Sequence, residues 1–110
     1  ELPAGLLDVA GEDALAAAQR ELAEEADLVA AEWSSIGAFY SSPGGSNEVI
    51  HLFEARDLGP APHSHDRTEE EAEIVLRWAA LDEVVAAVLA GRLRNAPLII
   101  AALSAHARRG

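Results

Sequence analysis

The chain has 110 residues, half of them hydrophobic, and a formal net charge of −11 at pH 7 from 19 acidic and 8 basic residues. This length suits one small domain, and we expect residues 1–110 to form it. The charge argues against nucleic acid as a partner, because nucleic-acid surfaces need clustered cations, and against an anionic membrane surface. Cysteine is absent, which excludes disulfides and thiolate metal sites.

The sequence holds no uninterrupted apolar run of the roughly 18–20 residues that a membrane-spanning helix needs. It also shows no basic segment followed by an apolar one, as a signal peptide would have. From these features we expect a cytoplasmic protein. The chain contains no methionine and opens on Glu-Leu-Pro-Ala-Gly, from which we expect that an N-terminal portion precedes residue 1.

The first half of the chain predicts a loop, a helix and two strands. Residues 1–12 are rich in Gly, Pro and Asp, which is typical of a strand end followed by a loop. A helix is predicted to start at Glu12 or Asp13 and to continue over residues 14–26, where Ala and Leu give high helix propensity. Its apolar stripe comprises Leu15, Ala18, Leu22 and Ala26. Strands are predicted over residues 32–40 and 48–55, joined by a turn-rich loop at 41–47.

The second half predicts a loop, a third strand and two helices. An exposed loop is predicted over residues 57–66, and a strand over 74–78 that places Trp78 in the core. Helices are predicted over residues 81–90 and 95–108. Their end signals are Asp82 and Asn95 as N-terminal caps, Gly91 as a stop and Pro97 in a first turn. Interleaved strands and helices without repeated βαβ units indicate an α/β protein, with a mixed α+β sheet flanked by helices.

Three glutamates crowd one stretch of the first predicted helix, RELAEE at residues 20–25. Glu21, Glu24 and Glu25 lie at spacings where like charges repel one another on a helix. Hard cations such as Mg²⁺ prefer oxygen ligands, so carboxylates one turn apart can share a metal ion that relieves the repulsion. Arg20 lies four residues before Glu24, a spacing at which the two can pair. The alternative is an acidic helix face that is simply solvated.

These residues belong to a longer pattern, which reads Gly5-x6-Glu12-x7-Arg20-Glu21-Leu22-x-Glu24-Glu25-x-Asp27-Leu28. The pattern resembles the Nudix box, over residues 5–28, with two departures. One extra residue lies between Gly5 and Glu12, where loops tolerate insertions. Asp27 stands where the box has a glycine that suits a left-handed helix end, a conformation that aspartate adopts more readily than most residues.

The resemblance implies a Nudix hydrolase with an α-β-α sandwich, here incomplete at its N-terminus. It implies that Mg²⁺, for which Mn²⁺ can substitute, is bound by Glu21, Glu24, Glu25 and the main-chain carbonyl of Ala4. It further implies a catalytic role for Glu25, with Arg20 as the clamp that holds Glu24 in position.

A second acidic run, at residues 69–73, offers a further catalytic group. Enzymes that resemble this chain often place a loop glutamate opposite the box, as a metal ligand or as the base for the attacking water. Glu70 and Glu71 are the candidates for that role. The alternative is a solvated acidic loop.

Pro43 narrows the expected substrate. It lies sixteen residues beyond Asp27, and a proline at that offset resembles the mark of the ADP-ribose pyrophosphatases in this superfamily. With Gly44 and Glu48 it forms an SPG…E loop like that of the same group, which implies substrate binding by these three residues. The alternative is an ordinary Pro-Gly turn between strands.

We therefore expect a Mg²⁺-dependent hydrolase that cleaves the small-molecule nucleoside diphosphate ADP-ribose to AMP and ribose 5-phosphate, and that acts as a homodimer. One alternative keeps this chemistry but assigns another nucleoside diphosphate-sugar as substrate. The other is a catalytically inactive Nudix-like binding domain, which the lengthened loop and Asp27 would favour.

Overall fold

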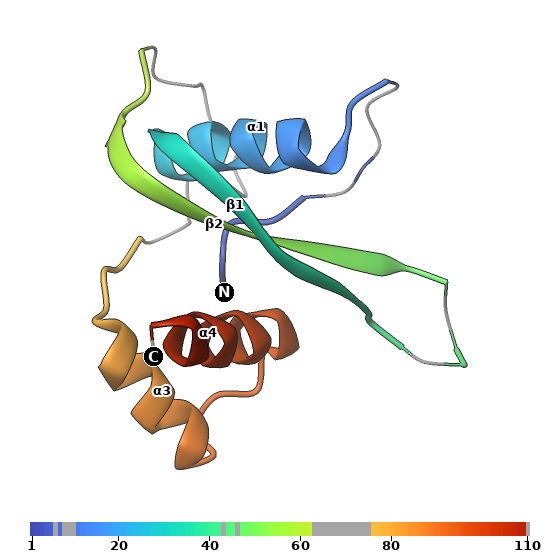
Figure 1. Cartoon of the computed structure of the whole chain (residues 1–110), viewed down its shortest axis with the longest axis vertical. Coiled ribbons are helices and arrows are strands. Elements are labelled where there is room, and N and C mark those ends of the chain that lie inside the picture. Colours follow the sequence, from blue (N-terminus) through green and yellow to red (C-terminus); the bar gives the residue numbers. More distant parts are fainter. Residues whose placement is uncertain (6, 8–10, 43, 46, 63–75, 110) are drawn as a thin grey trace. The chain divides into compact units, whose positions relative to one another are not determined.

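The computed structural model describes residues 1–5, 7, 11–42, 44–45, 47–62 and 76–109. In chain order these ranges contain α1 (Ala14–Ala26), β1 (Leu28–Tyr40), β2 (Val49–Pro60), α3 (Leu81–Leu89) and α4 (Ala96–Arg108) (Figure 1). The mixed α+β class predicted from the sequence is confirmed. None of the helices in these ranges combines the length and the apolar character that crossing a bilayer would require.

The chain divides into two compact units. The α1 unit comprises Pro3–Ser34 and Ala55–Arg77, and the α3–α4 unit comprises Glu1–Leu2, Ser35–Glu54 and Trp78–Gly110. Each of the two long strands contributes one end to each unit. All residues of the box pattern fall in the α1 unit.

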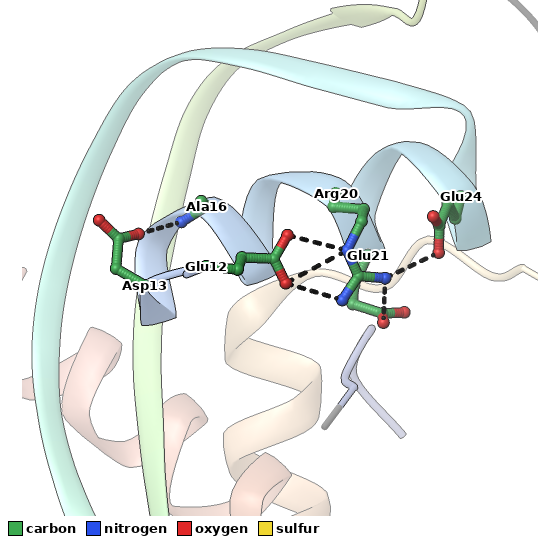
Figure 2. A network of polar contacts seen from close by, with 6 residues as sticks. All are labelled: Glu12, Asp13, Ala16, Arg20, Glu21 and Glu24. Carbon is green, nitrogen blue, oxygen red and sulfur yellow. Dashed lines mark hydrogen bonds and ion pairs between the residues drawn. The ribbon is translucent and has the colours of Figure 1, made fainter. Parts of the chain in front are cut away.

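The predicted extent of α1 through Ala26 is confirmed, with Asp13 rather than Glu12 at its start, and both ends have a local cause. The Asp13 carboxylate accepts a hydrogen bond from the Ala16 N–H at 2.7 Å, which caps the start of the helix (Figure 2). Asp27 ends it in the left-handed conformation, with φ 56° and ψ 37°, and its N–H donates to the Ala23 carbonyl at 3.0 Å. The substitution of the box glycine therefore leaves the helix end in the conformation that a glycine would favour.

The apolar stripe predicted for α1 is only partly correct. Leu15 is 37% exposed, whereas Ala17, which lies outside the predicted stripe, is buried. The pattern could not separate these faces because alanine occupies positions on both of them. Packing of α1 is consequently centred on a small side chain.

Strands β1 and β2 pair in a two-stranded sheet. At one end the Ser41 N–H donates to the Glu48 carbonyl at 3.3 Å, and at the other the Ala61 N–H donates to the Asp27 carbonyl at 2.9 Å. The strands are longer than predicted: β1 begins at Leu28, and β2 continues to Pro60 where a loop was expected. Cross-strand pairing thus orders backbone that local sequence does not mark as strand.

The strand predicted over residues 74–78 is not observed in its described part. Residues 76–80 have no regular secondary structure, and residues 74–75 lie outside the described ranges. The expectation that Trp78 lies in the core is wrong, because its side chain is 78% exposed. Trp78 follows an irregular backbone that gives it no sheet face on which to pack.

Helices α3 and α4 pack against each other, with Val85 and Ala102 buried. The predicted cap of α4 is confirmed, since Asn95 Oδ1 accepts from the Leu98 N–H at 2.9 Å. The predicted cap of α3 is wrong: Ala80 holds that position and Asp82 lies in the first turn. An acidic side chain there still interacts favourably with the helix dipole.

Candidate functional site

The central contact of the site joins Arg20, in the middle of α1, to Glu12, just before the helix begins. Arg20 Nε donates to Glu12 Oε2 at 3.0 Å and to Oε1 at 3.3 Å, and Nη2 donates to Oε1 at 3.0 Å (Figure 2). The planar guanidinium therefore grips both carboxylate oxygens along one edge, the geometry in which arginine binds a carboxylate most strongly.

The remaining amino group of Arg20 serves two glutamates of the helix. Nη1 donates to Glu21 Oε1 at 2.9 Å and to Glu24 Oε2 at 3.1 Å. The predicted pairing of Arg20 with Glu24 is confirmed. One guanidinium thus faces three carboxylates, which explains how α1 tolerates crowded negative charge.

Electrostatics in this cluster favour the charged form of Arg20. The Glu12 carboxylate, through its hydrogen bonds and its charge, raises the pKa of the guanidinium above its ordinary value, and Glu21 adds to the effect. The Glu12 and Glu21 side chains are only 13% and 15% exposed. Arg20 therefore stays protonated across any working pH and acts as a permanent counter-charge.

The backbone of Ala4 and Gly5, before α1, lies against the side chains of Glu25 and Glu21. The Ala4 N–H donates to Glu25 Oε2 at 3.0 Å. A Cβ atom placed on Gly5 would overlap the end of the Glu21 side chain. The first and last parts of the box pattern are therefore adjacent in space, and the glycine is needed for the close approach of this backbone to Glu21.

The site offers carboxylate oxygens, which are the ligands that a hard divalent cation such as Mg²⁺ takes. Within the described ranges, no three His, Asp or Glu side chains are arranged closely enough to hold a metal ion. Glu21 and Glu24 are directed at Arg20 instead.

The other predicted site residues are only partly described. Glu48 lies in the α3–α4 unit, where its Oε1 accepts from the Ser41 hydroxyl at 2.7 Å. Gly44, in the same loop, has a φ of +78°, as a turn glycine would. Pro43, Glu70 and Glu71 lie outside the described residues.

The contacts that were not predicted include the pairing of Glu12 with Arg20 and the approach of Gly5 to Glu21, both in the α1 unit, and the hydrogen bond between Ser41 and Glu48 in the α3–α4 unit. The first joins Arg20 to a residue before the helix cap, so helix spacing gave no signal for it. The other two depend on the path of loop backbone, which residue spacing does not specify.

Comparison with known proteins gives a family match and several relatives. The model of a family described as NUDIX domain matches residues 1–101. The chain is 39% identical, over 97% of its length, to an ADP-ribose pyrophosphatase of Mycobacterium tuberculosis (strain ATCC 25618 / H37Rv), of which it covers 51%. It is 39% identical, over 64% of its length, to an ADP-ribose pyrophosphatase of Bacillus subtilis (strain 168), of which it covers 38%. It is 33% identical, over 92% of its length, to a methanol dehydrogenase activator of Bacillus methanolicus, of which it covers 54%. The chain therefore spans about half the length of these relatives, or less.

Proposed function

The chain belongs to the Nudix domain family, and on that basis we propose that the protein is a Mg²⁺-dependent hydrolase that cleaves ADP-ribose to AMP and ribose 5-phosphate. The observation that carries the proposal is the box itself, in which Arg20 holds Glu12, Glu21 and Glu24 while the Ala4–Gly5 backbone lies against the helix glutamates. The names of two relatives that match the chain at 39% identity support ADP-ribose as the substrate.

The net charge of the chain supports a reaction that uses a cation. A diphosphate is an anion, and a chain with a net charge of −11 repels it. A bound Mg²⁺ or Mn²⁺ ion would offset the charge of the diphosphate oxygens and make the phosphorus more open to attack by water. We assign Glu21, Glu24, Glu25 and the Ala4 carbonyl to hold that ion.

The residues of the chain have distinct proposed roles in the hydrolysis. Water forms a new bond to one phosphorus, the bond from that phosphorus to the bridging oxygen breaks, and the attacking water loses a proton. Glu70 or Glu71 is the proposed base for that proton. Arg20 orients the carboxylates, and Pro43, Gly44 and Glu48 are proposed to contact the substrate.

A second candidate substrate is another nucleoside diphosphate-sugar. The match to a methanol dehydrogenase activator favours this second candidate, because that relative matches 92% of the chain and its name is not ADP-ribose pyrophosphatase. The inactive-domain alternative loses part of its basis, because Asp27 ends α1 in the left-handed conformation that suits the box glycine. That the protein is a homodimer and that it is cytoplasmic stay predictions. Light scattering on the full-length protein would test whether it is a dimer.

The function is tested by offering the full-length protein a panel of nucleoside diphosphate-sugars that includes ADP-ribose, each with and without Mg²⁺. We expect AMP to appear from ADP-ribose fastest, and to stop appearing when EDTA removes the metal. Faster turnover of another member of the panel would assign the second candidate, and no turnover of any member would contradict both.

A further inference from the structure

Three of the box carboxylates, those of Glu12, Glu21 and Glu24, converge on Arg20. Arg20 Nη1 lies 2.9 Å from Glu21 Oε1 and 3.1 Å from Glu24 Oε2 (Figure 2). In the part of the chain that the structure describes, no trio of acidic or histidine side chains is gathered for a metal ion. The guanidinium therefore supplies the positive charge that a cation would otherwise supply here.

The two edges of the guanidinium are held very differently. Glu12 binds the Nε–Nη2 edge through contacts of 3.0 to 3.3 Å to both of its oxygens. Glu21 and Glu24 each receive one hydrogen bond from Nη1. Because a forked pair is stronger than a single hydrogen bond, the contact to Glu21 can be lost while Arg20 stays in place.

The charges of the cluster leave room for a divalent cation. Three carboxylates face one guanidinium, so two negative charges in the cluster are not balanced by it. A cation bound to Glu21 would repel a guanidinium 2.9 Å from the same carboxylate. A cation on Glu21 would therefore weaken the hydrogen bond that Arg20 Nη1 donates to this carboxylate.

We propose that Arg20 is the built-in counter-ion of the metal-free site, and that a divalent cation takes the Glu21 carboxylate from Arg20 while Glu12 retains the guanidinium. The role assigned to Arg20 rests on the proposed function, because the proposed reaction depends on a bound divalent cation. Arg20 and the metal ion then compete for the Glu21 carboxylate. When the metal ion binds Glu21, the hydrogen bonds to Glu12 keep the guanidinium in its place.

The competition is tested by calorimetric titration of the full-length protein with Mn²⁺ alone, in the absence of any nucleotide. We expect Arg20→Gln to bind Mn²⁺ about two- to fivefold more tightly than the wild type, which corresponds to the loss of one partly exposed ion pair. Arg92→Gln is the matched control, since Arg92 is exposed after α3 and its loss changes the net charge equally. It should bind Mn²⁺ like the wild type.

The anchoring role of Glu12 is tested with a double-mutant cycle. Glu12→Gln alone frees Arg20 to remain on Glu21, so Mn²⁺ binding should weaken. The same change added to Arg20→Gln should weaken it less, because no guanidinium is left to compete. Equal effects in the two backgrounds would mean that Glu12 acts only through its charge, and would overturn the anchoring role.

A measurement on the wild type covers the case in which the variants do not fold. The Arg20 Nε–H resonance should shift as Mg²⁺ is added and yet stay protected from exchange, because Glu12 keeps its hydrogen bond. Mg²⁺ binding that leaves this resonance unchanged would overturn the proposal, as would Mn²⁺ binding to Arg20→Gln that is no tighter than to the wild type. If no form of the protein binds a divalent cation, the proposed function itself fails and the role of Arg20 falls with it.

Discussion

Arg20 holds Glu12 across eight residues with a fork of hydrogen bonds, Nε to Oε2 at 3.0 Å and Nη2 to Oε1 at 3.0 Å. The pair ties the chain that enters α1 to the second turn of that helix. It also fixes the plane of the guanidinium, so that Nη1 points at Glu21 and Glu24. The orientation of the acidic cluster is therefore set from outside the helix.

Replacing Glu12 by glutamine should lower the Tm of the metal-free protein by a few degrees, since the side chain keeps its shape but loses its charge. The loss should shrink in high salt, because salt screens a partly exposed pair. Glu32→Gln is the control, as Glu32 is exposed on β1. Equal Tm values for the two variants at low salt would contradict a stabilising role for the fork.

Asp27→Gly should raise the free energy of unfolding by about 0.5–1 kcal/mol, because a left-handed backbone strains any residue with a Cβ atom. Asp57, with φ 57° in β2, offers a matched site, and Asp57→Gly should give a similar gain. Urea denaturation measures both. A loss of stability confined to Asp27→Gly would mean that contacts of the Asp27 side chain outweigh the strain.

Asp13→Ala should lower the free energy of unfolding by about 1 kcal/mol, since it removes the acceptor 2.7 Å from the Ala16 N–H. Asp13→Ser should restore most of the loss, because serine also caps helices. Asn95→Ala, at the cap of α4, is the companion variant and should cost a similar amount. Equal urea midpoints for the alanine and serine variants of Asp13 would contradict a capping role.

Gly5→Ala should damage catalysis more than stability. Its methyl group would displace the flexible end of Glu21, a movement that costs little in folding but shifts a carboxylate that is proposed to hold the cation. We expect kcat/KM for ADP-ribose to fall about tenfold or more, as small misplacements of reacting groups do. Gly59→Ala should keep the wild-type value, because a Cβ there meets no atom within 4 Å.

Helix ends were the part of the fold most open to prediction. Asn95 and the bounds of α1 could be predicted because a cap needs only a side chain and an N–H a few residues away. Asp82 misled the prediction because acidic residues also favour the first turn, without capping. Short-range chemistry predicts a helix end well, but it does not fix the exact capping residue.

Strand lengths could not be predicted in the same way. The extension of β1 back to Leu28 and of β2 to Pro60 depends on pairing between segments far apart in sequence, such as Asp27 and Ala61. At the site, the pairing of Arg20 with Glu24 follows from helix geometry, whereas the approach of Gly5 depends on a loop path. Sequence spacing therefore predicted the contacts along α1 and missed those made to it by the loop.

The most direct test is the rate of Mg²⁺-dependent AMP release from ADP-ribose by the full-length protein and its Glu25→Gln variant. The variant keeps the size of the side chain that accepts from the Ala4 N–H but loses the charge that is proposed to hold the cation. We predict a fall in kcat/KM of about a hundredfold or more, with Glu32→Gln unchanged. Hydrolysis by Glu25→Gln at the wild-type rate would contradict the assignment of the box glutamates as the catalytic centre.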